Sequence, residues 1–278
     1  MTTSGFSNGL LSRRGFVAAV ATASAGGAAF VVTPANGAEG DAQYTPDPLD
    51  QLPTLDPELA RQVVLYSHSK IDRVKELVER HPELANAAMD WGFGDWESAL
   101  GAASHMGRRD MAELLLANGA RANIFTAAML GQLNIVRATI EANPGAQRIL
   151  GPHGFSLLQH AKAGKEQAMG VGEYLESLGD ADQKYTNLAL DQSQIDSLIG
   201  EYAYGAGPLR RIGFEHKKGN LRLTREGRFP RTLFHLGNLV FHPGGAPSVR
   251  INFEIEGNTA TSVSLNITDP GLVARRIG

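Results

Sequence analysis

The sequence contains no cysteine in 278 residues, and only two tryptophans. The missing cysteines exclude disulfides, thiolate metal ligands and cysteine nucleophiles. No histidine stands with a nearby serine and aspartate in a pattern that predicts a catalytic triad, and no glycine-rich phosphate loop follows a predicted strand. We therefore assign no catalytic residue and no cofactor from the sequence.

The first 38 residues carry few charged side chains, and the two regions that follow carry net charges of opposite sign. Residues 1–38 contain no acid and only two bases. Residues 39–198 carry a net charge of −10, whereas residues 199–278 carry a net charge of +5. Hydrophobic residues make up 42% of the chain and charged residues 20%, which is ordinary for a globular protein. This asymmetry indicates two separately built parts.

The two N-terminal bases, Arg13 and Arg14, precede Phe16 and an uncharged run rich in alanine, glycine and valine. The segment resembles a twin-arginine export signal, S/T-R-R-x-F-L-K, except that valine and alanine take the last two positions. Small residues allow cleavage after Gly37 or Ala38. The resemblance implies export to the periplasm or out of the cell, with no membrane attachment after cleavage. A single membrane anchor is the alternative, but the modest hydropathy argues against it.

Short helices alternate with turns between residues 58 and 182. The clearest pair joins an alanine- and leucine-rich helix at 97–107 to a second helix at 111–120, and a glycine ends each helix. Apolar residues open four such second helices, and these residues are Val74, Met111, Ile135 and Val171. The gaps between them are 37, 24 and 36 residues.

This arrangement resembles the ankyrin repeat, whose period is about 33 residues. The T-P-L-H-x-A start of that repeat corresponds to Ser98-Ala99-Leu100-Gly101-Ala102-Ala103, in which leucine and the last alanine match. The resemblance implies an all-α ankyrin-repeat solenoid of about four units, which buries its core by stacking. It also implies a protein-binding role without naming the partner.

Two loops of this region are the predicted contact surface. The first holds both tryptophans, and the second contains a histidine followed by a phenylalanine. Rigid aromatic rings in a glycine-rich loop are frequent anchors of protein interfaces. The predicted partner-binding residues are Trp91, Phe93, Asp95, Trp96, His153 and Phe155. The alternative is that these side chains fold inward and cover the array.

After residue 190 the periodicity changes from helical to alternating. Asp191 and Gln194 form a capping-box pattern that predicts a short helix at 193–199. Alternating runs predict strands at 201–204, 211–216, 220–223, 232–235, 239–242, 250–255 and 262–267. Tight turns between them favour an antiparallel meander, hence a small barrel or a curved sheet.

This second half is similar to the small lipocalin-like β-domain appended to bacterial β-lactamase-like serine hydrolases. The pieces that carry the resemblance are Gly200-Glu201-Tyr202, Gly219-Asn220-Leu221, the hairpin from Leu233 to Phe241 and Thr268-Asp269-Pro270-Gly271. We recognise no such hydrolase before it. A small ligand inside the barrel is an alternative function, and the residues predicted to line it are Phe214, Leu223, Phe234, Phe241 and Phe253.

The second half also carries histidines and a basic cluster. His235 and His242 flank one predicted hairpin and can be imagined as a metal pair, but no third ligand stands at a suitable spacing, so we predict no metal site. The basic cluster comprises Arg210, Arg211, Lys217, Lys218, Arg222, Arg225, Arg228 and Arg231. A solvated barrel face is the simplest interpretation. An anionic ligand, an acidic partner and docking onto the acidic array are the alternatives.

The sequence thus predicts an α+β multidomain protein. Its segments are a signal peptide (1–38), a disordered proline-rich linker (39–57), an ankyrin-repeat array (58–182), a linker with a short helix (183–198) and an antiparallel β-domain (199–278). The predicted function is that of an exported scaffold that binds another protein, without catalysis of its own and without nucleic acid. The alternatives are the ligand-binding barrel and an enzyme of unrecognised type at the domain junction.

Overall fold

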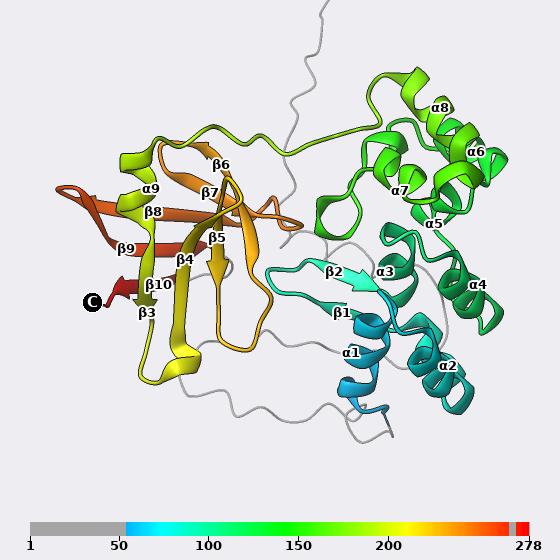
Figure 1. The fold of residues 1–278 in the computed structure, drawn as a ribbon, viewed down its shortest axis with the longest axis horizontal. Coiled ribbons are helices and arrows are strands. Elements are labelled where there is room, and N and C mark those ends of the chain that lie inside the picture. The colour runs from blue at the N-terminus through cyan, green and yellow to red at the C-terminus, as the bar shows by residue number, and fades with distance from the viewer. Residues whose placement is uncertain (1–53, 267–270, 278) are drawn as a thin grey trace, which may run out of the picture. The chain divides into compact units, whose positions relative to one another are not determined.

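The computed structural model describes residues 54–266 and 271–277 (Figure 1). The predicted signal residues Arg13, Arg14 and Phe16 lie outside the described residues, as does most of the predicted linker. Within the described ranges, no helix combines the length and the apolar character needed to cross a membrane.

Helices come first in the chain, as four consecutive pairs within residues 54–182. Their bounds are α1 (Pro57–Tyr66) with α2 (Ile71–Arg80), α3 (Ala99–His105) with α4 (Arg109–Ala117), α5 (Ile124–Met129) with α6 (Leu133–Ala142), and α7 (Leu157–Ala163) with α8 (Met169–Leu178). The first helix of each pair begins at a residue whose side chain accepts a backbone N–H bond; these residues are Asp56, Ser98, Asn123 and Ser156. Such caps satisfy donors that a helix leaves free at its start.

The first helices contact one another in chain order, α1 with α3, α3 with α5 and α5 with α7. Val74, Met111 and Val171, which the sequence predicts to open second helices, are buried in α2, α4 and α8. Ile135 differs, because its side chain in α6 is 51% exposed and its neighbour Val136 is buried instead. The predicted register is therefore one residue off in the third pair.

A short antiparallel sheet interrupts the helices. Strands β1 (Ala88–Asp90) and β2 (Trp96–Ser98) pair between α2 and α3, with Asp90 opposite Trp96. Ser98 ends β2 and caps α3, so that strand and helix share one rigid junction. The first half of the chain is therefore not all-α.

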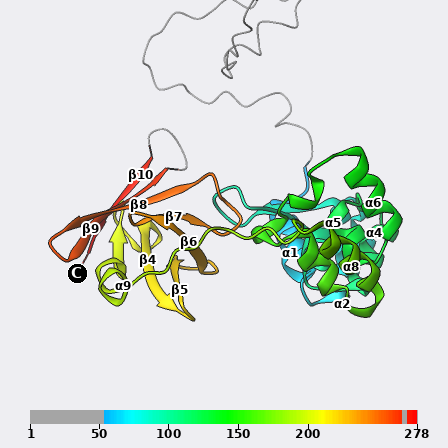
Figure 2. The ribbon, with the colours of Figure 1, turned by 90° about the horizontal axis from the view of Figure 1, so that it is seen from above.

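Eight strands of the described residues close into an antiparallel barrel in the order β10-β3-β4-β5-β6-β7-β8-β9 (Figure 2). Their bounds are β3 (Gly200–Ala203), β4 (Arg211–Lys217), β5 (Asn220–Thr224), β6 (Arg231–Gly237), β7 (Val240–Pro243), β8 (Arg250–Glu256), β9 (Thr259–Asn266) and β10 (Leu272–Arg276). Helix α9 (Gln192–Leu198) precedes them and carries a capping box between Asp191 and Gln194.

Strand β10 closes the barrel by pairing with β3 on one side and β9 on the other. Its Arg276 guanidinium donates to the carbonyls of Ser197 and Ile199 and to the hydroxyl of Tyr202. These bonds tie the last strand to the end of α9 and to the barrel core. The sequence analysis predicts no strand at 272–276.

The predicted fold class, an all-α ankyrin-repeat solenoid followed by a small barrel or curved sheet, is wrong. The described residues contain nine α-helices and a separate two-stranded sheet among them, and they end in a closed eight-stranded barrel. The prediction of an antiparallel β-barrel in the second half is confirmed. The β1–β2 hairpin is not predicted from the sequence, which assigns Glu97 and Ser98 to the helix at 97–107. Each of its strands has three residues, too few for a visible alternation.

Gly107 provides a test of how the helix pairs pack. Its φ is +66°, and a Cβ there would overlap the carbonyl oxygen of Ala163 at the end of α7. Gly119 has a φ of +85°, but a Cβ there would meet open space. We expect Gly107→Ala to lower the free energy of unfolding by roughly 3 kcal/mol, from left-handed backbone strain and overpacking together, and Gly119→Ala by about 1 kcal/mol from strain alone. Urea unfolding of both variants measures this, and equal losses would contradict it.

Candidate metal centre

Four side chains meet beside the β1–β2 hairpin. His68, Glu97, His105 and His153 each offer one ligand atom, and these four atoms all lie within 4.8 Å of one another. Each comes from a different segment: the turn between α1 and α2, strand β2, the last residue of α3, and the 3₁₀ turn Pro152–Gly154. We call these four residues the histidine–glutamate cluster.

Strand geometry explains why Glu97 is buried. Successive side chains of a strand point to opposite faces, so Asp95 and Glu97 share one face and Trp96 takes the other. Glu97 is 1% exposed and Asp95 2%, whereas Trp96 is 64% exposed. Ser98 then begins α3, which places His105 at the end of a short helix that starts beside Glu97.

The three imidazoles direct their Nε2 atoms at the Glu97 carboxylate. The Nε2 of His105 lies 2.8 Å from Oε1, and those of His68 and His153 each lie 3.4 Å from Oε2. Oε1 of Glu97 and Nε2 of His105 are both buried, and the contact between them lacks hydrogen-bond geometry. Within the described residues, neither atom has another hydrogen-bond partner. Leaving buried polar atoms unpaired is costly, so native proteins rarely do it without a functional reason.

The opposite edges of two imidazoles are fixed by hydrogen bonds. The Nδ1 of His68 lies 3.1 Å from the carbonyl oxygens of Val64 and Leu65, which only accept, so Nδ1 carries the proton and Nε2 is free. The Nδ1 of His153 lies 2.7 Å from Oδ2 of Asp95. Support of this kind, through a backbone carbonyl or a carboxylate, is how metal-binding histidines are usually oriented.

Trp91 orients the carboxylate itself. Its Nε1 donates to Oε2 of Glu97 at 2.7 Å, and its ring lies edge-on to both His68 and His153, with centroid distances of 5.6 and 5.3 Å. On the other side, the ring of Phe155 stacks on His105 at 5.0 Å. Aromatic rings therefore pack against the cluster on two sides and restrict the orientation of its side chains.

The charges in the cluster are strongly coupled. Burial alone would raise the pKa of Glu97, but the imidazoles of His105 and His153 outweigh it and lower the pKa to about 2. Burial would lower the pKa of His153, yet the carboxylates of Asp95 and Glu97 raise it to about 9. Burial lowers the pKa of His68, and Glu97 opposes it in part. Positive charge is thus favoured at the centre of the cluster.

Asp95 joins the cluster to the barrel. It accepts hydrogen bonds from the backbone N–H of His153 at 2.9 Å and from the guanidinium of Arg231, at the start of β6, at 2.5 Å. A Cβ at Gly245 would overlap the Asp95 carboxylate, so only glycine allows this approach. His153 itself has a φ of +60°, a left-handed conformation that is uncommon outside glycine. The Asp95 contacts hold it there.

A cavity of about 360 Å³ adjoins the cluster on the His153 side, and its lining also includes Trp91, Phe155, Phe229 and Arg231. The side chains of His68 and His153 are 21% and 23% exposed, whereas that of Glu97 is fully buried. The candidate ligand side chains are thus held in place by hydrogen bonds on one side and are accessible from the cavity on the other. Such a site can hold an ion and still admit a small molecule.

The structure separates the predicted partner-binding residues. Trp91, Asp95, His153 and Phe155 all contact the cluster or support it, through the hydrogen bonds and ring contacts above. Phe93 packs against the barrel core, whereas Trp96 projects into solvent and Phe155 is exposed on one side. Most of the six predicted partner-binding side chains therefore point inward rather than into solvent.

The predicted ligand-lining residues of the barrel mostly fill its core. Phe214, Leu223 and Phe241 are buried there, and Phe253 packs against them. Phe234 instead stacks on His242, with ring centroids 5.3 Å apart. In the β6–β7 pairing Phe234 stands opposite His242 and His235 opposite Phe241, so the two histidines are not cross-strand partners.

The histidine–glutamate cluster is not predictable from the sequence, because its members are 29, 8 and 48 residues apart and show no recognisable ligand spacing. One signal was present: Asp95 and Glu97 flank an aromatic residue at strand spacing, which puts two acids on one face. No family model matches the chain, and no curated protein matches it either. The assignment therefore depends on the geometry described above.

The Asp95–Arg231 pair is expected to be a major stabilising contact. Removing one partner of a buried ion pair leaves a charge uncompensated, so Arg231→Met should lower the free energy of unfolding by about 3 kcal/mol. Arg222 on the neighbouring strand β5 is the matched control, because its partner Glu215 is 43% exposed and such pairs contribute about 1 kcal/mol or less. Urea unfolding of Arg231→Met and Arg222→Met compares them. Similar losses would count against a structural role for Asp95.

Proposed function

We propose that the protein binds one divalent first-row transition-metal ion at the histidine–glutamate cluster. The observation that carries the proposal is the convergence of three Nε2 atoms on a fully buried carboxylate. The shortest of these contacts, between Nε2 of His105 and Oε1 of Glu97, lacks hydrogen-bond geometry, and neither atom has another partner in the described residues. An ion at the centre would satisfy both atoms and would compensate the Glu97 charge.

The donor set narrows the class of ion. Imidazole nitrogen suits zinc, copper, iron, nickel and cobalt, whereas magnesium and calcium prefer oxygen ligands. Three nitrogens and one carboxylate oxygen therefore favour a transition ion. The outer hydrogen bonds from Asp95, Trp91 and the Val64 carbonyl match the second layer of support that such ions require.

The adjoining cavity supports a reactive rather than a purely structural ion. Sites that act on substrates keep a position accessible to them. Because the cluster offers four candidate ligands, an ion that accepts a substrate here either leaves one of them uncoordinated or takes a fifth ligand. Here the cavity reaches His153 between Trp91 and Phe155. We therefore propose that the bound ion accepts a small molecule from this cavity, where it can act as a Lewis acid. Protein binding and export, inferred from the sequence, stay predictions.

Metal binding is tested with the full chain after removal of bound metal by a chelator. We expect one equivalent of zinc, nickel or cobalt per chain, measured by titration calorimetry and by elemental mass spectrometry after gel filtration. His105→Ala and Glu97→Gln remove a ligand and should weaken binding at least 100-fold. Asp95→Asn removes support for His153 and should weaken it about 10- to 100-fold.

His216→Ala is the matched control, because His216 is an exposed histidine on β4 outside the cluster. It should leave metal binding unchanged. His68→Ala, at a partly exposed position, provides a ligand variant that disturbs packing little. Circular dichroism confirms that each variant is folded. If the folded Glu97→Gln and His68→Ala variants retain one equivalent at the original affinity, the proposal fails.

A further inference from the structure

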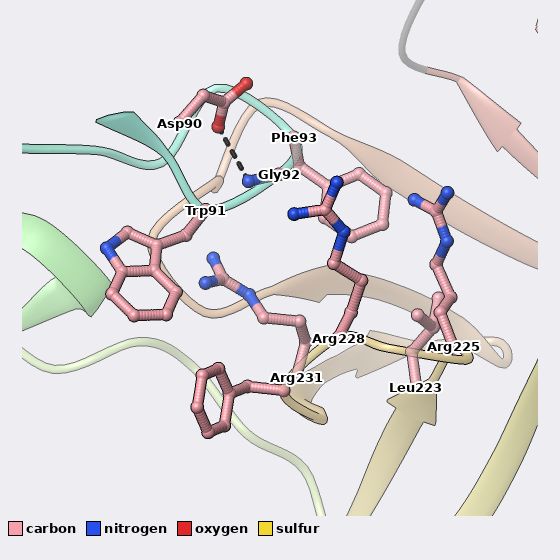
Figure 3. Close-up of a pocket in the computed structure, with 9 residues that line it drawn as sticks. Asp90, Trp91, Gly92, Phe93, Leu223, Arg225, Arg228 and Arg231 are labelled. Carbon is pink, nitrogen blue, oxygen red and sulfur yellow. Dashed lines mark hydrogen bonds between the residues drawn. The ribbon is translucent and has the colours of Figure 1, made fainter. Parts of the chain in front are cut away.

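We infer that a second pocket beside the metal site binds a small anionic molecule that carries a planar ring. This pocket, about 240 Å³ in volume, is lined by Arg225, Arg228, Arg231, Trp91, Phe93 and Phe229 among others, and we call it the arginine pocket (Figure 3). The inference deepens the proposed function, on which it rests for the ion, by naming the class of molecule brought to it.

The arginine pocket has an excess of positive charge. Figure 3 shows the side chains of Arg225, Arg228 and Arg231 directed from the barrel side toward the loop that carries Trp91 and Phe93. Arg231 is paired with Asp95, but neither Arg225 nor Arg228 forms an ion pair within the part of the chain that the structure describes. Guanidinium groups present a fork of donors that matches carboxylate and phosphate oxygens.

The single carboxylate in the lining does not cancel this charge. Asp90 accepts hydrogen bonds from the backbone N–H groups of Gly92 at 2.7 Å and Gly94 at 3.1 Å. Its oxygens are therefore engaged in shaping the β1–β2 loop. The lining thus holds three guanidinium groups against one carboxylate that is already hydrogen-bonded, so an anion entering the pocket would find unpaired cationic donors at Arg225 and Arg228.

Aromatic rings form the other wall. Phe229 is 65% exposed, and its ring centroid lies 5.7 Å from that of Trp91. Phe93 has a φ of +66°, so a phenylalanine is held in a left-handed conformation between two glycines. Backbone strain of this kind is concentrated at ligand sites. A flat ring can stack against Trp91 and Phe229 while its anionic group meets the arginines.

Shared residues connect this pocket with the metal site. Trp91, Phe229 and Arg231 line both the arginine pocket and the cavity that reaches His153. Trp91 also donates to the metal-binding carboxylate Glu97. A molecule whose anionic group lies at Arg225 and Arg228 therefore extends its ring toward the ion. Volumes of about 240 and 360 Å³ suit a small molecule rather than a macromolecule.

Phenyl phosphate is the probe that tests the inference. Titration calorimetry with the full chain should show one site, and inorganic phosphate (the anion without a ring) and phenol (the ring without the anion) should each bind at least tenfold more weakly. Benzoate distinguishes a carboxylate ligand from a phosphate ligand. The double variant Arg225→Ala/Arg228→Ala should weaken phenyl phosphate binding at least tenfold.

The matched control is Lys217→Ala/Lys218→Ala, which removes two exposed charges from the β4–β5 turn and should not change the affinity. In Trp96→Phe, Trp91 is the only tryptophan, so its fluorescence should change when phenyl phosphate binds. Loss of affinity in both double variants alike, or in neither, would overturn the inference. So would phenol binding as tightly as phenyl phosphate.

Metal content is measured separately on the same samples. If metal binds but Arg225→Ala/Arg228→Ala leaves the affinity for phenyl phosphate unchanged, the inference fails and the metal centre stands. If no metal binds, the proposed function fails, and phenyl phosphate binding to the chelator-treated chain, sensitive to Arg225→Ala/Arg228→Ala, still supports the arginine pocket. Tighter binding to the metal-loaded chain than to the chelator-treated one would support contact between the probe and the ion.

Discussion

The negative charge of a buried carboxylate must be balanced by nearby hydrogen-bond donors or cations. The groups that balance the charge of Glu97 come from several segments, and they determine how these segments pack around it. Moving a charge out of water costs several kcal/mol unless opposite charge and hydrogen bonds replace the lost solvent. Glu97 obtains them from imidazoles on three other segments and from the indole of Trp91. The requirement therefore constrains the turn after α1, the end of α3 and the Pro152–Gly154 turn together, although these segments are far apart in the sequence.

Asp95 extends the same constraint to the barrel. It lies two residues before Glu97 on the same face of the hairpin, and it binds both His153 and Arg231. The short segment from Asp95 to Glu97 thus supplies one acid to the centre of the cluster and another to its support. Trp96, between these two buried acids, is 64% exposed, as the alternation of side chains along a strand requires.

Sequence reasoning succeeds where the pattern is local. Alternation in strands such as Asn220–Thr224 predicts the antiparallel barrel, and the capping box at Asp191 predicts α9. It fails for β1, β2 and β10, which are short or interrupted by exposed arginines, and it takes paired helices for a complete solenoid. The metal centre could not be predicted from spacing, because tertiary packing, not one motif, brings His68 and His153 together. The loop that holds Trp91 was nevertheless singled out, for a different role.

The position of β10 in the barrel bears on how the chain folds. Strands β3 to β9 pair in sequence order, so each can join as soon as it is available, but closure requires residues 272–276 to enter between β3 and β9. Until then both edges offer unpaired backbone groups, which is the condition under which strands from different chains associate. During synthesis at about 5–20 residues per second, the barrel thus spends seconds as an open sheet. Protection of those two edges is therefore the condition for folding without association between chains.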